Sequence, residues 1–243
     1  MGLRYRDDPD LAFLQQASHE DLEALARCLT HDEKNEKRWA QELLDDPAYR
    51  DNQKDLRKAW QSIAAELQSF GGDSFVNLVR RTGVTYREIV TDVCKRLDVV
   101  VTAEGGIADL ETQLMDELLK RLSGAGEADR APLQDAVSAQ AGSARRLTMD
   151  EVRELLRTDR KIALLVAQAL AGAVSQVLLR AAAASVTTVV AGRAAAALVP
   201  GLGLVMAPTL VSIATGPAYR VTTCAVLQVA QMRQQSLQND HYQ

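Results

Sequence analysis

Aromatic residues are scarce in this sequence, since Phe, Trp and Tyr make up only 4% of its 243 residues. Aromatic and β-branched side chains are the ones that favour pleated sheets, so the packing has to rest on Leu, Val, Ile and Ala. A chain of this length can bury one large core or two small ones. The composition therefore predicts an all-α protein built as a multi-helix bundle.

Cysteine and histidine are equally rare, with three of each in the chain. Cys28, Cys94 and Cys224 are far apart and lie in apolar helical patterns, which is typical of reduced core residues in a cytosolic protein. No Cys or His pair has the spacing of zinc ligands, so no metal is expected. The charged first ten residues lack the apolar stretch of a signal peptide, which also favours a cytoplasmic location.

Motifs of catalysis and of nucleotide binding are missing as well. Gly201-Leu-Gly203 stands alone, with no predicted strand before it, and therefore does not define a nucleotide loop. The Gly-Gly-Asp-Ser run at 71–74 is better explained as a corner between helices than as an anion site. No nucleophile motif is visible, and the basic pairs lack interleaved aromatic residues. We expect a protein that is not an enzyme, with no cofactor and no nucleic-acid partner.

Acidic residues are absent between positions 160 and 239. Six basic residues lie in that span, namely Arg160, Lys161, Arg180, Arg193, Arg220 and Arg233. Taking these six and Asp240 out of the net charge of −4 leaves about −9 for residues 1–159. Such a split indicates an anionic surface or an acidic partner for the last third, or alternatively a buried helical core without room for charges.

Local signals place the helices. Ser18 can cap a helix, Thr148 opens a capping box with Glu151, and Pro217 suits the first turn of the last helix. The strongest amphipathic pattern runs over residues 56–70. The predicted structural core around this pattern, including the glycine stop and the next cap, is Trp60, Leu67, Phe70, Gly71, Gly72, Asp73 and Tyr86.

Changes in composition divide the chain into four predicted regions. These are an N-terminal helical module at 1–30, an acidic helical region at 31–122, a linker-like segment rich in Ala, Gly and Ser at 123–147 with one helix, and an apolar, acid-poor helical region at 148–243. The last region is expected to contain an Ala/Gly-rich helical hairpin.

The apolar region raises the question of a membrane segment. Residues 162–179 carry no charge, and as a helix they would rise ~27 Å, just under a ~30 Å hydrocarbon core. Residues 194–219 are also uncharged, but prolines and glycines interrupt them. Three interpretations remain open: a buried hairpin in a soluble bundle, conditional or peripheral membrane association, and constitutive spanning. The residues expected to contact lipid or a partner are Arg180, Arg193, Arg220, Leu165, Leu170, Leu198, Leu202 and Leu204.

The stretch that begins at Trp60, W-x-x-I-A-x-E-L-Q-x-F-G-G-D-S, resembles the core signature of the bacterial YaaW family. The N-terminal D-L-x-F-L-Q at 10–15 and the C-terminal G-P-A-Y-R-V-T at 216–222 resemble the ends of the same family, so the resemblance covers roughly residues 6–233. It implies a helical protein, distantly grouped with ubiquinol–cytochrome c assembly chaperones, and it supplies no catalytic motif.

These observations lead to two functional hypotheses. The first is a non-enzymatic protein that engages anionic membrane lipid through residues ~160–233, as a regulated effector linked to stress or defence. Such a protein would be cytoplasmic or peripheral at the inner membrane. The alternative is a soluble assembly chaperone or adaptor that binds a hydrophobic helix of a client protein. The sequence leaves the oligomeric state open, including a homo-oligomer.

Overall fold

The computed structural model describes residues 3–31, 42–70, 83–100, 105–124, 126–159, 162, 165, 166 and 217–240. Over these residues the secondary structure is helical, with no β-strand, which confirms the all-α prediction. In chain order the elements are η1 (Ala12–Gln16), α1 (His19–Thr30), η2 (Leu43–Asp45), α2 (Pro47–Asp51), η3 (Leu56–Ala59), α3 (Trp60–Phe70), α5 (Tyr86–Arg96), α6 (Ile107–Gly124), α7 (Glu127–Gln140), α8 (Met149–Thr158) and α11 (Pro217–Asp240).

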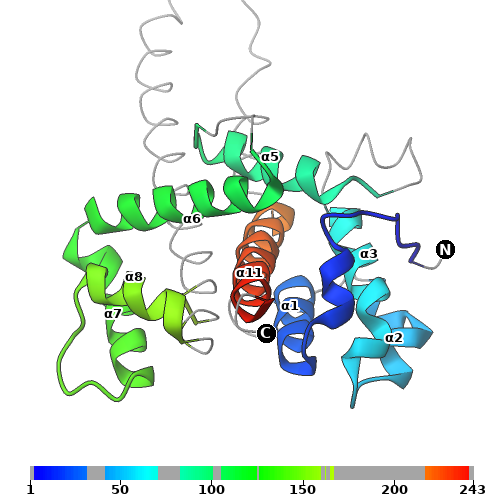
Figure 1. Ribbon diagram of the computed structural model, residues 1–243, viewed down its shortest axis with the longest axis horizontal. Coiled ribbons are helices and arrows are strands. Elements are labelled where there is room, and N and C mark those ends of the chain that lie inside the picture. The colour runs from blue at the N-terminus through cyan, green and yellow to red at the C-terminus, as the bar shows by residue number, and fades with distance from the viewer. Residues whose placement is uncertain are drawn as a thin grey trace, which may run out of the picture.

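Helix α11 lies at the centre of the described structure. It packs against α1, α6, α5 and α3, and its most extensive contact is with α1 (Figure 1). Between Val221 and Met232 nearly every side chain of α11 is buried. A helix buried on all sides has little room for charge, and Arg233 is the only charged residue between positions 221 and 237, although Thr222, Thr223, Gln228 and Gln231 are buried polar residues. The last helix of the chain is thus the core around which the earlier helices pack.

The N-terminal part of the structure begins with a helix whose cap was predicted from sequence. The Ser18 hydroxyl accepts a hydrogen bond from the Asp21 amide at 3.2 Å, which satisfies one of the unpaired N–H groups in the first turn of α1. The apolar face of α1, formed by Leu22, Leu25 and Leu29, is fully buried. This helix therefore faces the core along its whole length.

The strong amphipathic pattern at 56–70 forms two elements, a short 3₁₀ turn (η3) followed by α3. Leu67 and, in α5, Tyr86 have no exposed surface, as expected for core residues. Trp60 and Phe70, predicted to lie in the core, are only partly buried at its edge. Trp60 packs edge-to-face on Tyr5 with ring centroids 5.1 Å apart, so the N-terminal segment covers part of its ring. Gly71, Gly72 and Asp73 lie outside the described residues.

Helices α6, α7 and α8 form the opposite side of the molecule from α2 and α3 (Figure 1). The predicted capping box at the start of α8 is present, since Thr148 and Glu151 each accept a hydrogen bond from the other's backbone N–H. The segment predicted to be linker-like contains α7, whose Leu133 and Val137 are buried against the core. A helix with a buried face therefore joins α6 to α8.

The apolar C-terminal region is described at its two ends. Ile162 and Val166 are fully buried, and Leu165 packs partly buried against the same core. On the far side, α11 begins at Pro217 as predicted. Residues 167–216 of the region expected to contain the hairpin lie outside the described residues, and with them Arg180, Arg193, Leu170, Leu198, Leu202 and Leu204.

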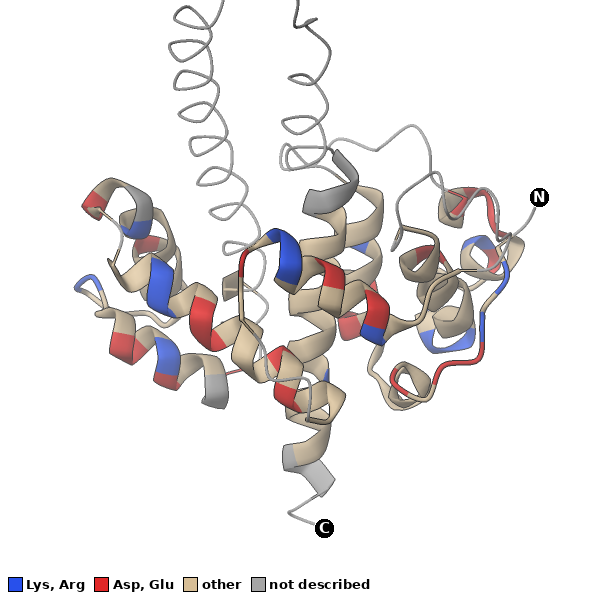
Figure 2. Ribbon diagram, turned by 90° about the horizontal axis from the view of Figure 1, so that it is seen from above, with Lys and Arg blue, Asp and Glu red and all other residues tan. Residues whose placement is uncertain are grey.

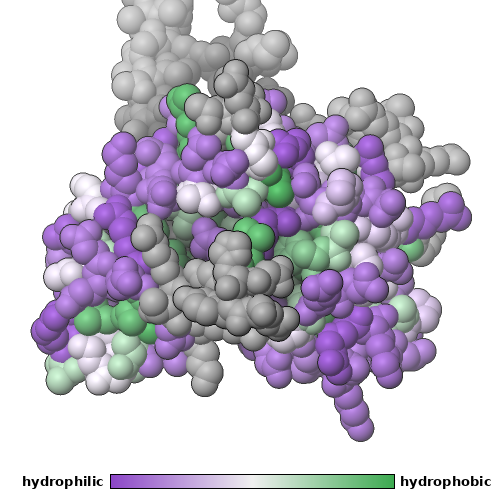
Figure 3. All heavy atoms as spheres, viewed as in Figure 1, coloured by the Kyte–Doolittle hydropathy of each residue, from purple (hydrophilic) through white to green (hydrophobic). Residues whose placement is uncertain are grey.

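The surface of the described helices is largely hydrophilic. In the view of Figure 3, purple side chains predominate over small, separate green areas. Val100 is the most exposed of the large apolar side chains in the described part of the chain, at 92%. Of the helices in this part, none is both long and apolar enough to cross a membrane.

Candidate functional site

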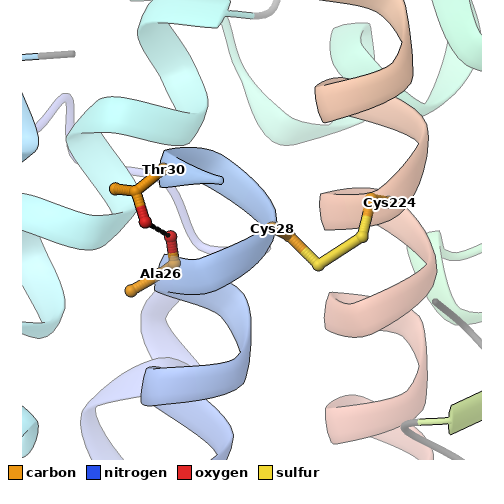
Figure 4. Close-up of a disulfide and its surroundings, with 4 residues drawn as sticks. All are labelled: Ala26, Cys28, Thr30 and Cys224. Atoms are coloured by element: carbon orange, nitrogen blue, oxygen red, sulfur yellow. Dashed lines mark hydrogen bonds between the residues drawn. A yellow bond between two sulfur atoms is a disulfide. The ribbon is translucent and has the colours of Figure 1, made fainter. Parts of the chain in front are cut away.

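The contact between α1 and α11 contains a disulfide, Cys28–Cys224 (Figure 4). Its two Cα atoms are 5.7 Å apart, close to the commonest separation for a bonded pair. The interpretation of these cysteines as reduced core residues is therefore wrong for two of the three. It failed because residues 196 positions apart in sequence become neighbours only when the last helix packs on the first. Cys94 is a free, buried thiol as expected.

About two and a half turns of α11 beyond the disulfide, a buried ion pair joins segments that are far apart in the sequence. The Glu111 carboxylate on α6 accepts hydrogen bonds from the Arg233 Nε and from the Tyr86 hydroxyl, both at 2.8 Å. The Arg233 side chain is 11% exposed and that of Glu111 is 1% exposed. Arg233 also donates to the Asp10 carbonyl oxygen. The pair thereby links α11 to α6, to α5 and to the N-terminal segment.

Aromatic rings complete the surroundings of Arg233. Its Cζ atom lies 4.3 Å from the centroid of the Phe13 ring and 5.8 Å from that of Tyr86. A guanidinium over an aromatic face is attracted by the ring quadrupole, and the attraction grows when water is excluded. The cation is therefore held by a carboxylate, a carbonyl and two rings, all of them supplied by the protein itself.

Burial governs the protonation of this cluster. It raises the pKa of the Glu111 carboxyl, while the positive charge of Arg233 acts in the opposite direction. Burial also raises the pKa of Tyr86 well above its ordinary value, so the hydroxyl stays a hydrogen-bond donor. A phenol that remains protonated and a carboxylate that is already paired are poor nucleophiles and poor bases. The arrangement is suited to holding helices together.

Arg233 changes the interpretation of the charge split. It is one of the six basic residues counted in the acid-free last third, and it is neutralised inside the molecule by Glu111 of α6. A buried, paired arginine is not available to an anionic surface. The sequence carried a signal for this pair, because Glu111 lies with Ile107 and Leu110 on the buried face of α6, where the other residues recur at helical spacing and are apolar. A single acidic residue on a face that packs into the core is expected to pair with a basic residue.

A second buried carboxylate fixes the N-terminal segment. Asp8, 1% exposed, accepts a 2.6 Å hydrogen bond from the Tyr86 amide in the first turn of α5 and a 2.9 Å bond from the Asp10 amide. Next to it, the Gln68 amide pairs with both backbone groups of Arg6 at 2.9 Å. The segment before η1 is therefore attached to α3 and α5 through buried polar contacts that local sequence patterns did not reveal.

Glu66 on α3 is a third buried acid. Its carboxylate accepts a hydrogen bond from the Leu43 amide at 3.1 Å. Burial is the main reason why its pKa is raised to about 7, and the negative charges of Glu42 and Asp46 raise it further. Among the described residues it pairs with no cation, so this carboxyl is a site where the fold tolerates a charge at some cost.

The corner between α6, α7 and α8 has a different electrostatic character. It holds a pocket of about 400 Å³ whose walls include three arginines, Arg130, Arg146 and Arg153. Each arginine forms an ion pair with a nearby carboxylate, from Glu127, Asp135 or Asp150. Figure 2 shows both signs of charge close together on these helices, whereas α11 is almost entirely uncharged. The pocket walls are nearly balanced in charge and do not select an anion.

Of the predicted contact residues, the structure describes Leu165 and the backbone of Arg220. Leu165 lies partly buried against the core, and Arg220 belongs to the first turn of α11, although its side chain is not among those described. The other predicted contact residues fall in the segment 167–216. Within the described part of the chain, no group of three or more His, Cys, Asp or Glu side chains is arranged to hold a metal ion.

Together, these contacts define an all-α protein in which the N-terminal module and the C-terminal helix are joined by a disulfide and a buried ion pair. Comparison with known proteins identifies its relatives. The UPF0174 protein YaaW of Escherichia coli (strain K12) is 35% identical over 239 residues, covering 96% of this chain and 97% of the relative. The chain belongs to the UPF0174 family. A UPF0174 protein of Helicobacter pylori (strain J99) is 31% identical over 242 residues, covering 95% of this chain and 93% of its own length.

A family described as a domain of unknown function, DUF3944, matches residues 5–39. This match includes η1, α1 and the cysteine that bonds to α11. No solved structure matches the chain. None of these names states an activity, so the grouping with ubiquinol–cytochrome c chaperones that the resemblance implied stays a prediction.

Proposed function

We propose that this protein is a non-enzymatic, membrane-engaging protein in which a helical body holds the two ends of an apolar, acid-free segment, residues 167–216. The observation that carries the proposal is where that segment starts and ends. Ile162 and Val166 before it and Val221 after it are buried in the same core. A segment fixed at both ends to one body can be presented to a surface without losing its attachment.

The composition of the segment favours lipid as its partner. Its 50 residues contain no Asp or Glu, and Arg180 and Arg193 are its only charged side chains. Basic residues near an anionic membrane contribute ~1 kcal/mol each, and apolar side chains add to binding through the area they bury. Residues 221–233, which the sequence-based hypothesis had included, belong to the buried central helix and are excluded from the proposed contact.

Vesicle flotation of the full-length protein tests the proposal. We expect the protein to float with vesicles of phosphatidylcholine, and in larger amount when phosphatidylglycerol is added. The double variant Arg180→Glu/Arg193→Glu should lose the gain due to anionic lipid. Leu170→Glu/Leu202→Glu should lose flotation with both kinds of vesicle, because it introduces charges that are costly to bury in lipid.

The matched control is Arg50→Glu/Lys54→Glu, which makes the same change of charge at exposed positions of the helical body. It should float like the parent protein. A fragment ending at residue 159 is unsuitable as a control, because it would lack the central helix. Failure to float with any vesicle would overturn the proposal. It would favour the alternative of an assembly chaperone or adaptor that captures a hydrophobic client helix.

A further inference from the structure

The disulfide lies where the two ends of the chain meet. Cys28 belongs to α1, within the N-terminal segment that matches a family of its own, and Cys224 lies near the start of the central helix α11. With Cα atoms 5.7 Å apart, the two helices already have the spacing that a bonded pair requires. The bond therefore forms and breaks without moving either helix axis.

The fold does not depend on this bond for its core. Proteins that rely on disulfides are small and rich in cysteine because their cores are insufficient. This chain has three cysteines in 243 residues. Its apolar core is continuous from α1 through α3, α5 and α6 to α11. We expect the dithiol form to keep the same fold, with the apolar faces of α1 and α11 still packed together.

The two sulfur atoms differ in access, and both differ from the third cysteine. Cys28 is buried, at 7% exposed, whereas Cys224 is a partly exposed residue, so we assign the first contact with a small molecule to Cys224. Cys94 is buried, and desolvation raises the pKa of its thiol to about 11, so it stays protonated and unreactive. Thiol chemistry in this protein is thereby confined to one pair.

We propose that Cys28 and Cys224 form a reversible thiol–disulfide site that is oxidised by a small-molecule disulfide of the glutathione type. The Cys224 thiolate attacks one sulfur of that disulfide, forms a mixed disulfide and releases one thiol. The Cys28 thiolate then attacks Cys224 Sγ, closes the protein disulfide and releases the second thiol. The protein loses two electrons and two protons, and the small disulfide is reduced to two thiols.

Oxidation has a defined mechanical effect. It attaches the first turns of α11 to α1 through a covalent bond, which is absent in the dithiol form. The redox state of the surrounding thiols therefore determines how readily the start of α11 separates from α1. The inference concerns the helical body and does not depend on membrane engagement.

The test uses the full-length protein equilibrated in glutathione buffers that range from fully reduced to fully oxidised. Counting thiols in denaturant should give three in the reduced protein and one in the oxidised protein, the remaining thiol being Cys94. The thermal midpoint of the oxidised protein should be higher by about 5–15 °C, since a disulfide that closes a long loop restricts the unfolded chain. Amide exchange over Val221–Ala225 should be slower when the protein is oxidised.

Three variants separate this site from general effects of oxidation. Cys94→Ala should keep the full redox-dependent change of the thermal midpoint. Cys28→Ser and Cys224→Ser should each melt at one temperature in both buffers, close to that of the reduced parent protein. The proposal is overturned if the parent retains three thiols in oxidised glutathione, or if its bond survives a full excess of reduced glutathione. Equal thermal midpoints of the parent in fully reduced and fully oxidised buffer would also overturn it. These measurements on the parent protein decide the question even if a variant fails to fold.

Discussion

Two regions of the molecule, the central helix and the α7–α8 corner, contain arginine–carboxylate pairs in opposite surroundings. Around α11, Arg233 and Glu111 are buried, separated by 122 residues in sequence, and enclosed by aromatic rings and a backbone carbonyl. At the α7–α8 corner, Arg145 and Glu151 are six residues apart and largely exposed, with 63% and 38% of their side chains accessible. Arg146 pairs with Asp135 in a similar way.

The buried and the exposed ion pairs differ in what happens to the remaining charge when one partner is removed. A buried charge whose partner is removed has no water to replace it, so the loss is large. An exposed charge is solvated again at once, and salt already weakens its pairing. We infer that the long-range pair at α11 stabilises the tertiary fold, whereas the short-range pairs at the corner affect the surface alone.

The largest effect is expected from Arg233→Met. This change removes the cation and leaves the buried Glu111 carboxylate without a counter-charge, which should lower the free energy of unfolding by about 3–5 kcal/mol at pH 7. Urea unfolding followed by circular dichroism measures it. The double variant Arg233→Met/Glu111→Gln should recover much of the loss, because no buried charge remains. A single variant that unfolds at the parent's urea concentration would show that the two sides do not differ.

The next effect concerns Glu66, the buried acid that pairs with no cation among the described residues. Its pKa is raised from an ordinary value of 4.5 to about 7. Below pH 4.5 the carboxyl is protonated in both the folded and the unfolded chain and has no effect on stability. Between pH 4.5 and 7 the folded state holds a proton that the unfolded state releases, so stability is lost as the pH rises.

Glu66→Gln removes this penalty and keeps an oxygen that can accept the Leu43 hydrogen bond. At pH 8 we expect the variant to be more stable than the parent by roughly 2–3 kcal/mol, because each tenfold difference in proton affinity between the folded and unfolded states corresponds to ~1.4 kcal/mol. Near pH 4 the two proteins should unfold at the same urea concentration. A stability difference that did not change with pH would point to packing as its cause.

A smaller effect is expected on the other side of the molecule, at the capping box of α8. Thr148→Ala removes the side chain that accepts from the Glu151 amide, which should cost about 1 kcal/mol. Thr148→Ser keeps the hydroxyl and is the matched control. If the alanine and serine variants have the same thermal midpoint, the hydroxyl of Thr148 does not contribute to stability.

The smallest effect should follow from Arg145→Ala. The arginine is exposed, so the thermal midpoint should move by no more than about 2 °C and still less in high salt. The change should instead be visible at Glu151, whose pKa of about 2 is held down mainly by the hydrogen bond from Arg145. Titration of that carboxyl by NMR should give a higher pKa in the variant. A loss of stability as large as that of Arg233→Met would contradict the expected difference between buried and exposed ion pairs.

The sequence predicted those features whose causes lie within a few residues of each other. Ser18, the Thr148 capping box and Pro217 at the start of α11 are confirmed, since helix caps act across one turn. The apolar residues that recur at helical spacing over 86–97 and 107–122 likewise lie on the buried faces of α5 and α6. These signals suffice for the fold class because each helix buries the face that its pattern defines.

The contacts at the centre of the molecule were not predictable in this way. The partner of Cys28 is 196 residues away, and that of Arg233 is 122 residues away. Neither distance leaves a periodic signal, so Arg233 was counted among the six basic residues of the acid-free span with no indication that it pairs with Glu111. Trp60 was assigned to the core from its helical face, yet it lies partly buried at the edge of the core, where Tyr5 covers part of its ring. Long-range pairing is decided by how helices meet, which local patterns do not specify.

The position of α11 also bears on how the chain is made. Helix α1 is among the first elements to leave the ribosome, and the helix with its most extensive contact is the last of those described. At ~5–20 residues per second, the interval between Thr30 and Pro217 takes roughly 10–40 s. During that time Leu22, Leu25 and Leu29 have no central helix to cover them. The core therefore closes only after α11 has been synthesised, and until then these apolar side chains need other cover.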